Sequence, residues 1–165
     1  MDTIPVISSL NNTYCQQIID IILPIQQIEF NVPITLEAQP DLLDIETNYH
    51  QTGGDFWGAI YNEQLVGTIA LIAFDNNAAA IRKMFVLKEY RGKELGIAQL
   101  LLNNLIDYCK RNNITDIYLG TVEMLKAAHR FYEKNGFTRL AKQDLPESFP
   151  LMAADTIFYQ LHLNN

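Results

Sequence analysis

The first half of this chain contains no lysine and no arginine. Residues 1–81 carry ten acidic side chains, whereas all twelve lysines and arginines fall between residues 82 and 142, together with six acids. A basic stripe with interleaved aromatic residues is absent, so nucleic acid is not an expected partner. The basic middle segment would instead attract a compact polyanionic ligand.

Cysteine is scarce, and long apolar runs are missing. Cys15 and Cys109 each lie in an apolar, helix-like stretch, which favours buried free thiols over a disulfide. The N-terminal residues lack the basic start and apolar run of a signal peptide. Residues 18–25 are apolar but interrupted by Asp20 and Pro24, and they are too short to span a bilayer. We therefore expect a cytoplasmic protein without membrane partners.

The sequence also lacks the residue patterns of a metal site and of a catalytic nucleophile. No histidine, cysteine or acidic residues have metal-ligand spacing, so we expect no metal site. No nucleophile elbow accompanies a serine or cysteine, which disfavours a covalent acyl-enzyme.

The hydrophobic pattern predicts a single α/β domain over residues 1–165. Alternating or continuous apolar runs predict strands, and helical spacing predicts helices between them. The expected strands cover 4–7, 56–61, 65–74, 78–87, 117–119, 137–141 and 156–163. The expected helices cover 12–23, 25–30, 40–49, a long segment ending near 111, and 124–134. This order predicts a mixed sheet covered by helices.

The segment 91–98 joins a strand to a helix and contains two glycines, Gly92 and Gly96. Glycine adopts positive φ at little cost and lets the backbone approach a ligand closely. The first N–H groups of a helix have no intrahelical partner, and the helix dipole adds partial positive charge there. The segment therefore predicts a phosphate-binding turn. It lacks the Walker pattern and the three spaced glycines of the dinucleotide fingerprint, so those two ligand classes are disfavoured.

Two motifs resemble the GNAT family of N-acetyltransferases. Arg91-x-x-Glu94-x-Gly96 is similar to that family's pyrophosphate loop, and Ala127-Ala128-His129-Arg130-Phe131-Tyr132-Glu133-Lys134-Asn135-Gly136-Phe137 is similar to its Ala-x-x-x-Tyr-Glu-Lys-x-Gly-Phe helix. The resemblance covers residues 55–143 well. It implies a single-domain fold with a mixed, mostly antiparallel sheet of six or seven strands, splayed centrally, with helices on both faces. Acetyl-CoA would lie in the split.

The resemblance also implies roles for particular residues. Backbone groups would bind the coenzyme pyrophosphate at Arg91, Gly92, Lys93, Glu94, Leu95, Gly96, Ile97 and Ala98. Met84, Phe85 and Val86 would hold the pantetheine arm and the acetyl group. Tyr132 would be the general acid for the leaving thiolate.

Two positions depart from the family pattern. Glu94 stands where glycine is usual, and its carboxylate would repel pyrophosphate unless it points to solvent or caps the helix. Leu125 stands where many relatives have an asparagine that hydrogen-bonds pantetheine, so Lys126 or backbone groups would take over that contact. His129, one helical turn before Tyr132, could carry protons, but it is interpreted as a surface histidine.

The sequence indicates the residues that would bind the acceptor amine less clearly than those that would bind the coenzyme. The first two helices and residues 144–150 should form the substrate mouth, with Trp57, Tyr49 and Phe149 as candidate lining residues, although a tryptophan in a strand more often belongs to the core. Glu37, Glu46 and Asp55 are candidate bases that no spacing distinguishes, and a water chain could serve instead. The acidic first half either favours a cationic amine or only maintains solubility.

We therefore expect an enzyme: an acetyl-CoA-dependent N-acetyltransferase that moves the acetyl group directly to a primary amine. The amine could belong to a small molecule, a peptide or a protein. A non-catalytic domain that binds acetyl-CoA or coenzyme A, and an interaction module that uses the acidic first half, are the alternatives. A homodimer is left open.

Overall fold

Seven strands form one hydrogen-bonded sheet in the order β1-β2-β3-β4-β5-β7-β6. The computed structural model describes residues 4–164. The strands are β1 (Val6–Ser9), β2 (Asp55–Tyr61), β3 (Gln64–Phe74), β4 (Ala78–Val86), β5 (Asp116–Thr121), β6 (Thr138–Leu140) and β7 (Ile157–His162). Strands β4 and β5 are parallel, whereas β1–β2, β2–β3, β5–β7 and β6–β7 are antiparallel. The predicted mixed, mostly antiparallel sheet is confirmed.

Four α-helices accompany the strands in the described part of the chain. They are α1 (Cys15–Pro24), α2 (Ile45–Asn48), α3 (Ile97–Arg111) and α4 (Lys126–Lys134). The π-helical segment Ile25–Glu29 continues α1 beyond Pro24. Short 3₁₀ segments include Asn12–Tyr14, Pro40–Leu43 and Lys88–Tyr90. Among residues 4–164, no helix is both long and apolar enough to cross a membrane.

The chain divides into two compact units, and strand β4 runs from one into the other. Unit 1 holds the residues up to Ile72 together with Arg82–Asp107, and unit 2 holds Ala73–Ile81 together with the residues from Tyr108 onward. The predicted single domain and the predicted central splay both concern how these units are arranged, and they stay predictions.

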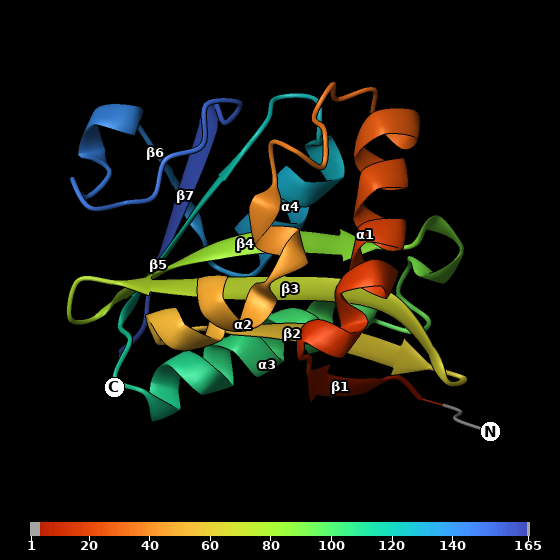
Figure 1. The fold of residues 1–165 in the computed structure, drawn as a ribbon. Coiled ribbons are helices and arrows are strands. Elements are labelled where there is room, and N and C mark those ends of the chain that lie inside the picture. The colour runs from red at the N-terminus through yellow and green to blue at the C-terminus, as the bar shows by residue number, and fades with distance from the viewer. Residues whose placement is uncertain (1–3, 165) are drawn as a thin grey trace. The chain divides into compact units, whose positions relative to one another are not determined.

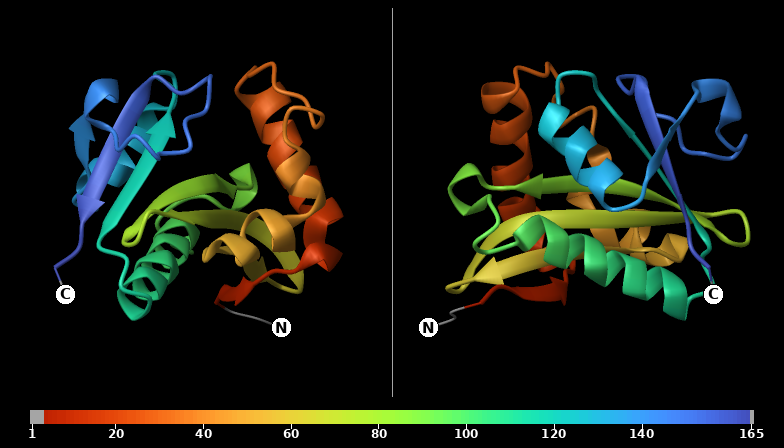
Figure 2. Two further views of the ribbon diagram at one scale, coloured as in Figure 1. Left: turned by 60° about the vertical axis from the view of Figure 1, so that its left-hand side comes forward. Right: turned by 180° about the vertical axis from the view of Figure 1, so that it is seen from behind.

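Unit 1 is built from strands with helices on both faces. Helices α1 and α2 lie on one face of β2 and β3, and α3 lies on the other (Figures 1 and 2). Helix α1 buries the isoleucine stripe that its helical spacing predicted, including Ile18 and Ile22. On the opposite face, a Cβ at Gly67 would come within 3.2 Å of an Ile97 methyl group, so glycine lets α3 approach β3 closely.

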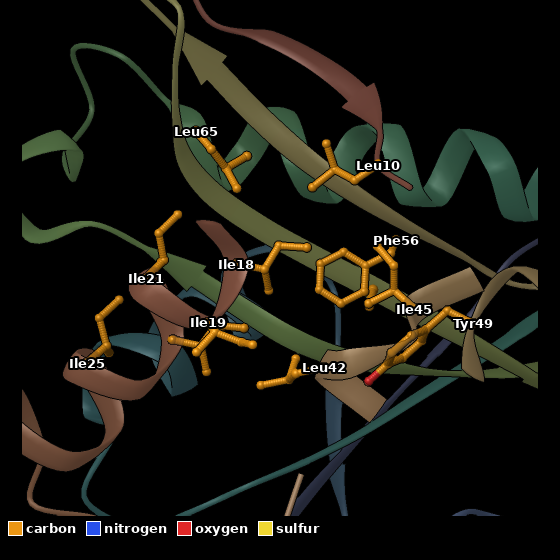
Figure 3. Close-up of a cluster of buried hydrophobic side chains, with 12 residues drawn as sticks. Leu10, Ile18, Ile19, Ile21, Ile25, Leu42, Ile45, Tyr49, Phe56 and Leu65 are labelled. Carbon is orange, nitrogen blue, oxygen red and sulfur yellow. The ribbon is translucent and has the colours of Figure 1, made fainter. Parts of the chain in front are cut away.

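The core of unit 1 joins α1, the 40–49 segment and the strands. Figure 3 shows Ile18 and Ile21 from α1 gathered with Leu42, Tyr49 and Phe56. The Tyr49 and Phe56 rings meet edge to face with centroids 5.1 Å apart. Burial of one such side chain stabilises the fold by roughly 1.5–3 kcal/mol.

The segment 40–49 differs from the single helix expected there. It forms the 3₁₀ segment Pro40–Leu43 and then the short helix α2, because Asp44 interrupts the helical backbone with a φ of −153°. The Asp44 carboxylate accepts a hydrogen bond from the Thr47 N–H at 3.1 Å, which makes Asp44 the N-cap of α2. Asp41 lies before this break and Tyr49 after it, and the Tyr49 hydroxyl donates a hydrogen bond to Asp41 Oδ2.

Unit 2 contains β5, β6, β7 and helix α4. The parallel β4–β5 ladder consists of the pairs Ala78–Asp116, Ala79–Ile117 and Ala80–Tyr118. Tyr118 packs with Phe149 and Phe158 in a separate apolar cluster. Helix α4 ends before Gly136, whose φ of +90° is the left-handed conformation that commonly follows a helix.

Candidate active site

The loop from β4 to α3 has the backbone that the sequence predicted for an anion site. Gly92 has a φ of +117° and Gly96 a φ of +61°, and α3 begins at Ile97. Space is not the reason for either glycine, because a Cβ at Gly92 would meet nothing within 4 Å and one at Gly96 would lie 3.9 Å from the Lys93 carbonyl oxygen. The requirement is the positive φ, which strains other L-residues. The turn brings residues 93–96 before the unpaired N–H groups of the helix.

Glu94 lies in this turn and its side chain is exposed to solvent. Solvent screening weakens the repulsion between such a carboxylate and a bound phosphate. Exposure fits the expected arrangement in which the Glu94 side chain points to solvent.

Arg91 makes a contact that the sequence analysis missed. Its guanidinium forms an ion pair with Glu29, in which NH2 lies 2.8 Å from Oε1 and NH1 binds Oε2. Its Nε–H donates to the Val86 carbonyl at 2.8 Å. The hydrogen bond from Arg91 lowers the pKa of Glu29. The Arg91 side chain therefore ties the loop to the end of β4 and to the segment after α1.

The end of β4 leads into this loop. Met84, Phe85 and Val86 are partly buried, and Phe85 packs against the core of unit 1. Leu87 N–H donates to the Val66 carbonyl at 2.9 Å, which holds the strand end against β3. The three predicted acyl-binding residues thus lie immediately before the loop, and Arg91 bonds to the last of them.

Tyr132 on α4 is 6% exposed and belongs to the core of unit 2. Its ring centroid lies 5.5 Å from that of Phe137 and 6.0 Å from that of Tyr159. Burial raises the pKa of the Tyr132 phenol well above its usual value. The phenol is therefore protonated at neutral pH, as a general acid must be. Its role toward the leaving thiolate stays a prediction.

Two neighbours of Tyr132 on α4 differ in exposure. Lys126 forms an ion pair with Glu123 and its side chain is 58% exposed, so it is held only loosely. His129 is 5% exposed, and its Nε2 lies 2.9 Å from the Val122 carbonyl oxygen. The interpretation of His129 as a surface residue is wrong, because this hydrogen bond and the Tyr159 ring 6.1 Å away enclose it.

The three candidate bases have different surroundings. Glu46 accepts a hydrogen bond from the Asn12 N–H at 2.9 Å. Asp55 accepts from the Ser9 hydroxyl at 2.7 Å and lies 3.3 Å from His50 Nδ1. Both carboxylates therefore tie the N-terminal segment to the rest of unit 1, whereas Glu37 is exposed. Trp57, Tyr49 and Phe149 are all buried, Tyr49 within the core cluster shown in Figure 3.

Asp41 and Lys83 form a cluster that sequence reasoning did not find. Lys83 Nζ lies 3.7 Å from Asp41 Oδ2, and the same oxygen accepts a hydrogen bond from the Tyr49 hydroxyl at 2.5 Å. Burial, followed by the charge of Asp41, raises the pKa of Tyr49. No local motif marks this cluster, because its members come from residues far apart in the chain.

The structure is that of an α/β protein in which a glycine-bearing loop joins strand β4 to the N-terminus of helix α3. Comparison with known proteins identifies the family: residues 19–137 match the acetyltransferase (GNAT) family. This match covers most of the chain, and the chain belongs to the GNAT family. The predicted family is confirmed, as is the predicted α/β fold with a mixed, mostly antiparallel sheet.

Two solved structures are similar over nearly their whole length. One is an acetyltransferase of the GNAT family from Staphylococcus aureus Mu50, which is 46% identical with a TM-score of 0.93, over 97% of this chain and 99% of that one. The other is an acetyltransferase from Streptococcus agalactiae 2603, which is 31% identical with a TM-score of 0.92, over 98% of this chain and 100% of that one.

A curated relative carries a more specific name. The N-acetylaspartate synthetase of Danio rerio is 38% identical over 106 residues, which are 63% of this chain and 37% of the relative. The chain therefore spans well under half the length of that relative.

Proposed function

We propose that this protein is an acetyl-CoA-dependent N-acetyltransferase that transfers the acetyl group directly to a primary amine. The observation that carries the proposal is the loop between β4 and α3, where Gly92 and Gly96 take positive φ immediately before a helix N-terminus. Membership of the GNAT family supports the same reaction class.

In this proposal the coenzyme is held mainly by backbone groups. Backbone N–H groups within residues 91–98 bind the pyrophosphate, helped by the partial positive charge of the α3 N-terminus. The N–H groups of Arg91 and Gly96 are excepted, because they donate to the carbonyl oxygens of Lys88 and Gly92. Met84, Phe85 and Val86 bind the pantetheine arm and the acetyl group, and Lys126 supplements them from α4. The Glu29–Arg91 pair keeps the loop in place.

Tyr132 supplies the proton that the departing thiolate needs. Bound acetyl-CoA provides an acyl group on a good leaving group. The Tyr132 phenol carries its proton at neutral pH, and it donates this proton to the sulfur as the carbon–sulfur bond breaks. No covalent acyl-enzyme is required, because the amine attacks the thioester carbonyl directly.

The acceptor is proposed to be the amine of a small molecule, with L-aspartate as the first candidate. The relatives named N-acetylaspartate synthetase support this choice, since they are 32–38% identical to the chain. The chain covers only 37% of the Danio rerio relative, so the choice of aspartate is a proposal. The free thiols of Cys15 and Cys109 fit the proposed cytoplasmic location.

Two measurements test the proposal. Calorimetry should show one-site binding of acetyl-CoA, and a thiol-release assay should show turnover that depends on an added amine. The amine panel should include L-aspartate, other L-amino acids, polyamines and a peptide with a free N-terminus. Acetyl-CoA binding without turnover on any amine would favour a non-catalytic coenzyme-binding domain, and absence of binding would refute both functions.

A further inference from the structure

Lys83 is a buried lysine on β4, directly before the residues proposed to hold the acyl group. Its side chain is only 9% exposed. Its Nζ donates to the Gln39 side-chain oxygen at 2.5 Å and lies 3.7 Å from Asp41 Oδ2. A buried ammonium is costly unless it is paired, so these contacts account for its presence in the fold.

The backbone at Lys83 is strained. Its φ of +52° lies in the left-handed region, which costs an L-residue roughly 1–2 kcal/mol. The Thr68 hydroxyl on β3 donates to the Lys83 carbonyl at 2.7 Å and holds this irregular position within the strand. Such strain persists where the surroundings enforce it, and it is concentrated at functional sites.

Asp41 is the member of this cluster that reaches solvent. Its side chain is 26% exposed, whereas Tyr49 is 2% and Gln39 is 1% exposed. Its Oδ2 is held by the Tyr49 hydroxyl and lies beside Lys83. Within residues 4–164, no hydrogen bond reaches its other oxygen, Oδ1. The carboxylate is thus oriented through one oxygen and open to a ligand through the other.

We propose that Asp41 is the residue that binds the acceptor amine and removes its proton, an inference that rests on the N-acetyltransferase function proposed above. Asp41 Oδ1 accepts an N–H of the amine, while Tyr49 and Lys83 hold Oδ2. Lys83 belongs to the strand that continues into Met84–Val86, so the Asp41 carboxylate, 3.7 Å from Lys83 Nζ, lies beside the strand that leads to the proposed acyl site.

The proton balance is consistent with a carboxylate base. The amine nitrogen forms a bond to the acetyl carbon, and the carbon–sulfur bond breaks with its electrons leaving on sulfur. The nitrogen becomes cationic as it bonds and is then a much stronger acid than a free ammonium, so a carboxylate can take its proton. Asp41 releases that proton to water, and sulfur takes a proton from Tyr132, which regains one from solvent.

A purely structural role is the competing explanation. The same contacts would then only attach the 3₁₀ segment Pro40–Leu43 and α2 to β4. That role depends on the balance of charge between Asp41 and Lys83, whereas amine binding depends on the Asp41 carboxylate itself. Variants that restore the balance without restoring the carboxylate separate the two explanations.

The test begins with Asp41→Asn, an isosteric change, measured in the full chain. We expect acetyl-CoA affinity by calorimetry to stay within about twofold, and thiol release with L-aspartate, or with the best amine of the panel, to fall by about 100-fold or more. Asp20→Asn is the matched control, because Asp20 is an exposed aspartate on α1 of the same unit. It should retain wild-type turnover.

The double variant Asp41→Asn/Lys83→Met decides between the explanations. It removes both charges, so we expect thermal stability to recover toward that of the wild type while turnover stays low. Recovery of turnover together with stability would overturn the assignment, as would wild-type turnover in Asp41→Asn. A wild-type protein that binds acetyl-CoA but uses no amine would instead refute the proposed function, and Asp41 with it.

Discussion

Gly96 allows the most specific prediction at the scale of single residues. Its φ is +61°, and a methyl group there would meet no close atom, so Gly96→Ala isolates the conformational cost. We expect a loss of about 1–2 kcal/mol in the free energy of unfolding, measured with denaturant. Coenzyme A binding, measured by calorimetry, should weaken because the loop can relieve the strain by changing shape.

Gly96→Asn is the control for this prediction. Asparagine tolerates the left-handed region better than alanine, so it should lose less stability and less affinity. Equal losses in the two variants would show that the loop depends on something other than backbone conformation.

Glu94 provides a test of electrostatics in the same loop. Its carboxylate lies in the proposed pyrophosphate loop but is exposed, so solvent screens its repulsion of a bound phosphate. Removing the charge with Glu94→Gln or Glu94→Gly should therefore tighten acetyl-CoA binding only modestly, by about 0.3–1 kcal/mol at low ionic strength. The gain should shrink at high salt. Glu89→Gln, which removes an exposed charge just before the residues 91–98 that are proposed to bind the pyrophosphate, should change the Kd less. An unchanged Kd in the Glu94 variants would mean that this carboxylate does not act on the pyrophosphate.

The residues that the sequence could identify are those whose role is local. Gly92 and Gly96 were predicted because a turn between a strand and a helix demands positive φ within a few residues. The Glu29–Arg91 pair joins residues 62 positions apart, and Lys83 meets Gln39 from 44 positions away. Such contacts depend on how strands and helices pack, which no local spacing encodes.

Among the structural elements, the segment after α1 is linked to the loop by Glu29 and Arg91. Glu29→Gln removes the charge of this pair, and we expect a loss of at most about 1 kcal/mol of stability at pH 7, because both side chains are partly exposed. Binding of acetyl-CoA should also weaken, since Arg91 no longer anchors the loop to its neighbours.

The pH dependence of this effect has a definite sign. The folded state lowers the pKa of Glu29 below its ordinary value of 4.5, so the ion pair stabilises the protein above that pH. The contribution is lost as pH falls through the lower folded pKa. The difference in thermal stability between wild type and Glu29→Gln should therefore be present at pH 7 and disappear in acid. A difference that persists in acid would assign the loss to packing.

Helix α4 carries the proposed general acid. Tyr132→Phe keeps the ring contacts with Phe137 and Tyr159 and removes only the hydroxyl. We expect kcat to fall by about 100-fold or more with acetyl-CoA affinity unchanged. Wild-type kcat in this variant would remove Tyr132 from the mechanism, and Phe131→Leu, on a partly exposed neighbour, serves as the control for packing.

The order of helices and strands was predictable because the apolar residues of each long element have a clear spacing. The isoleucines of α1 and the apolar runs of β2, β3 and β4 gave segments that the structure confirms within a few residues. The prediction of a single helix over residues 40–49 was wrong. The apolar spacing of this segment suits one helix, and only the Asp44 cap interrupts it. Asp41 lies just before this break and contacts Lys83 on β4, far away in the sequence. No local spacing could therefore indicate Asp41 as the proposed base.

At the scale of the whole molecule, the charge distribution and the family both support acetyl-CoA as the proposed acetyl donor. Neither of them identifies the acceptor amine. All lysines and arginines lie in residues 82–142, the segment that also contains the anion loop, as a polyanionic coenzyme would require. The acidic first half supplies the proposed amine-binding carboxylate. Lys83, whose side chain is 9% exposed, forms an ion pair with that carboxylate in unit 1.

The central claim is that the protein transfers the acetyl group of acetyl-CoA directly to an amine. The stoichiometry of this reaction tests the claim most directly. Acetyl-CoA and L-aspartate, or the best amine of the panel, are incubated with the protein, and free thiol and acetylated amine are quantified together. The account predicts equal amounts of the two products, formed only when protein and amine are both present. Thiol released without acetylated amine would indicate thioester hydrolysis, and this result would contradict direct transfer to an amine.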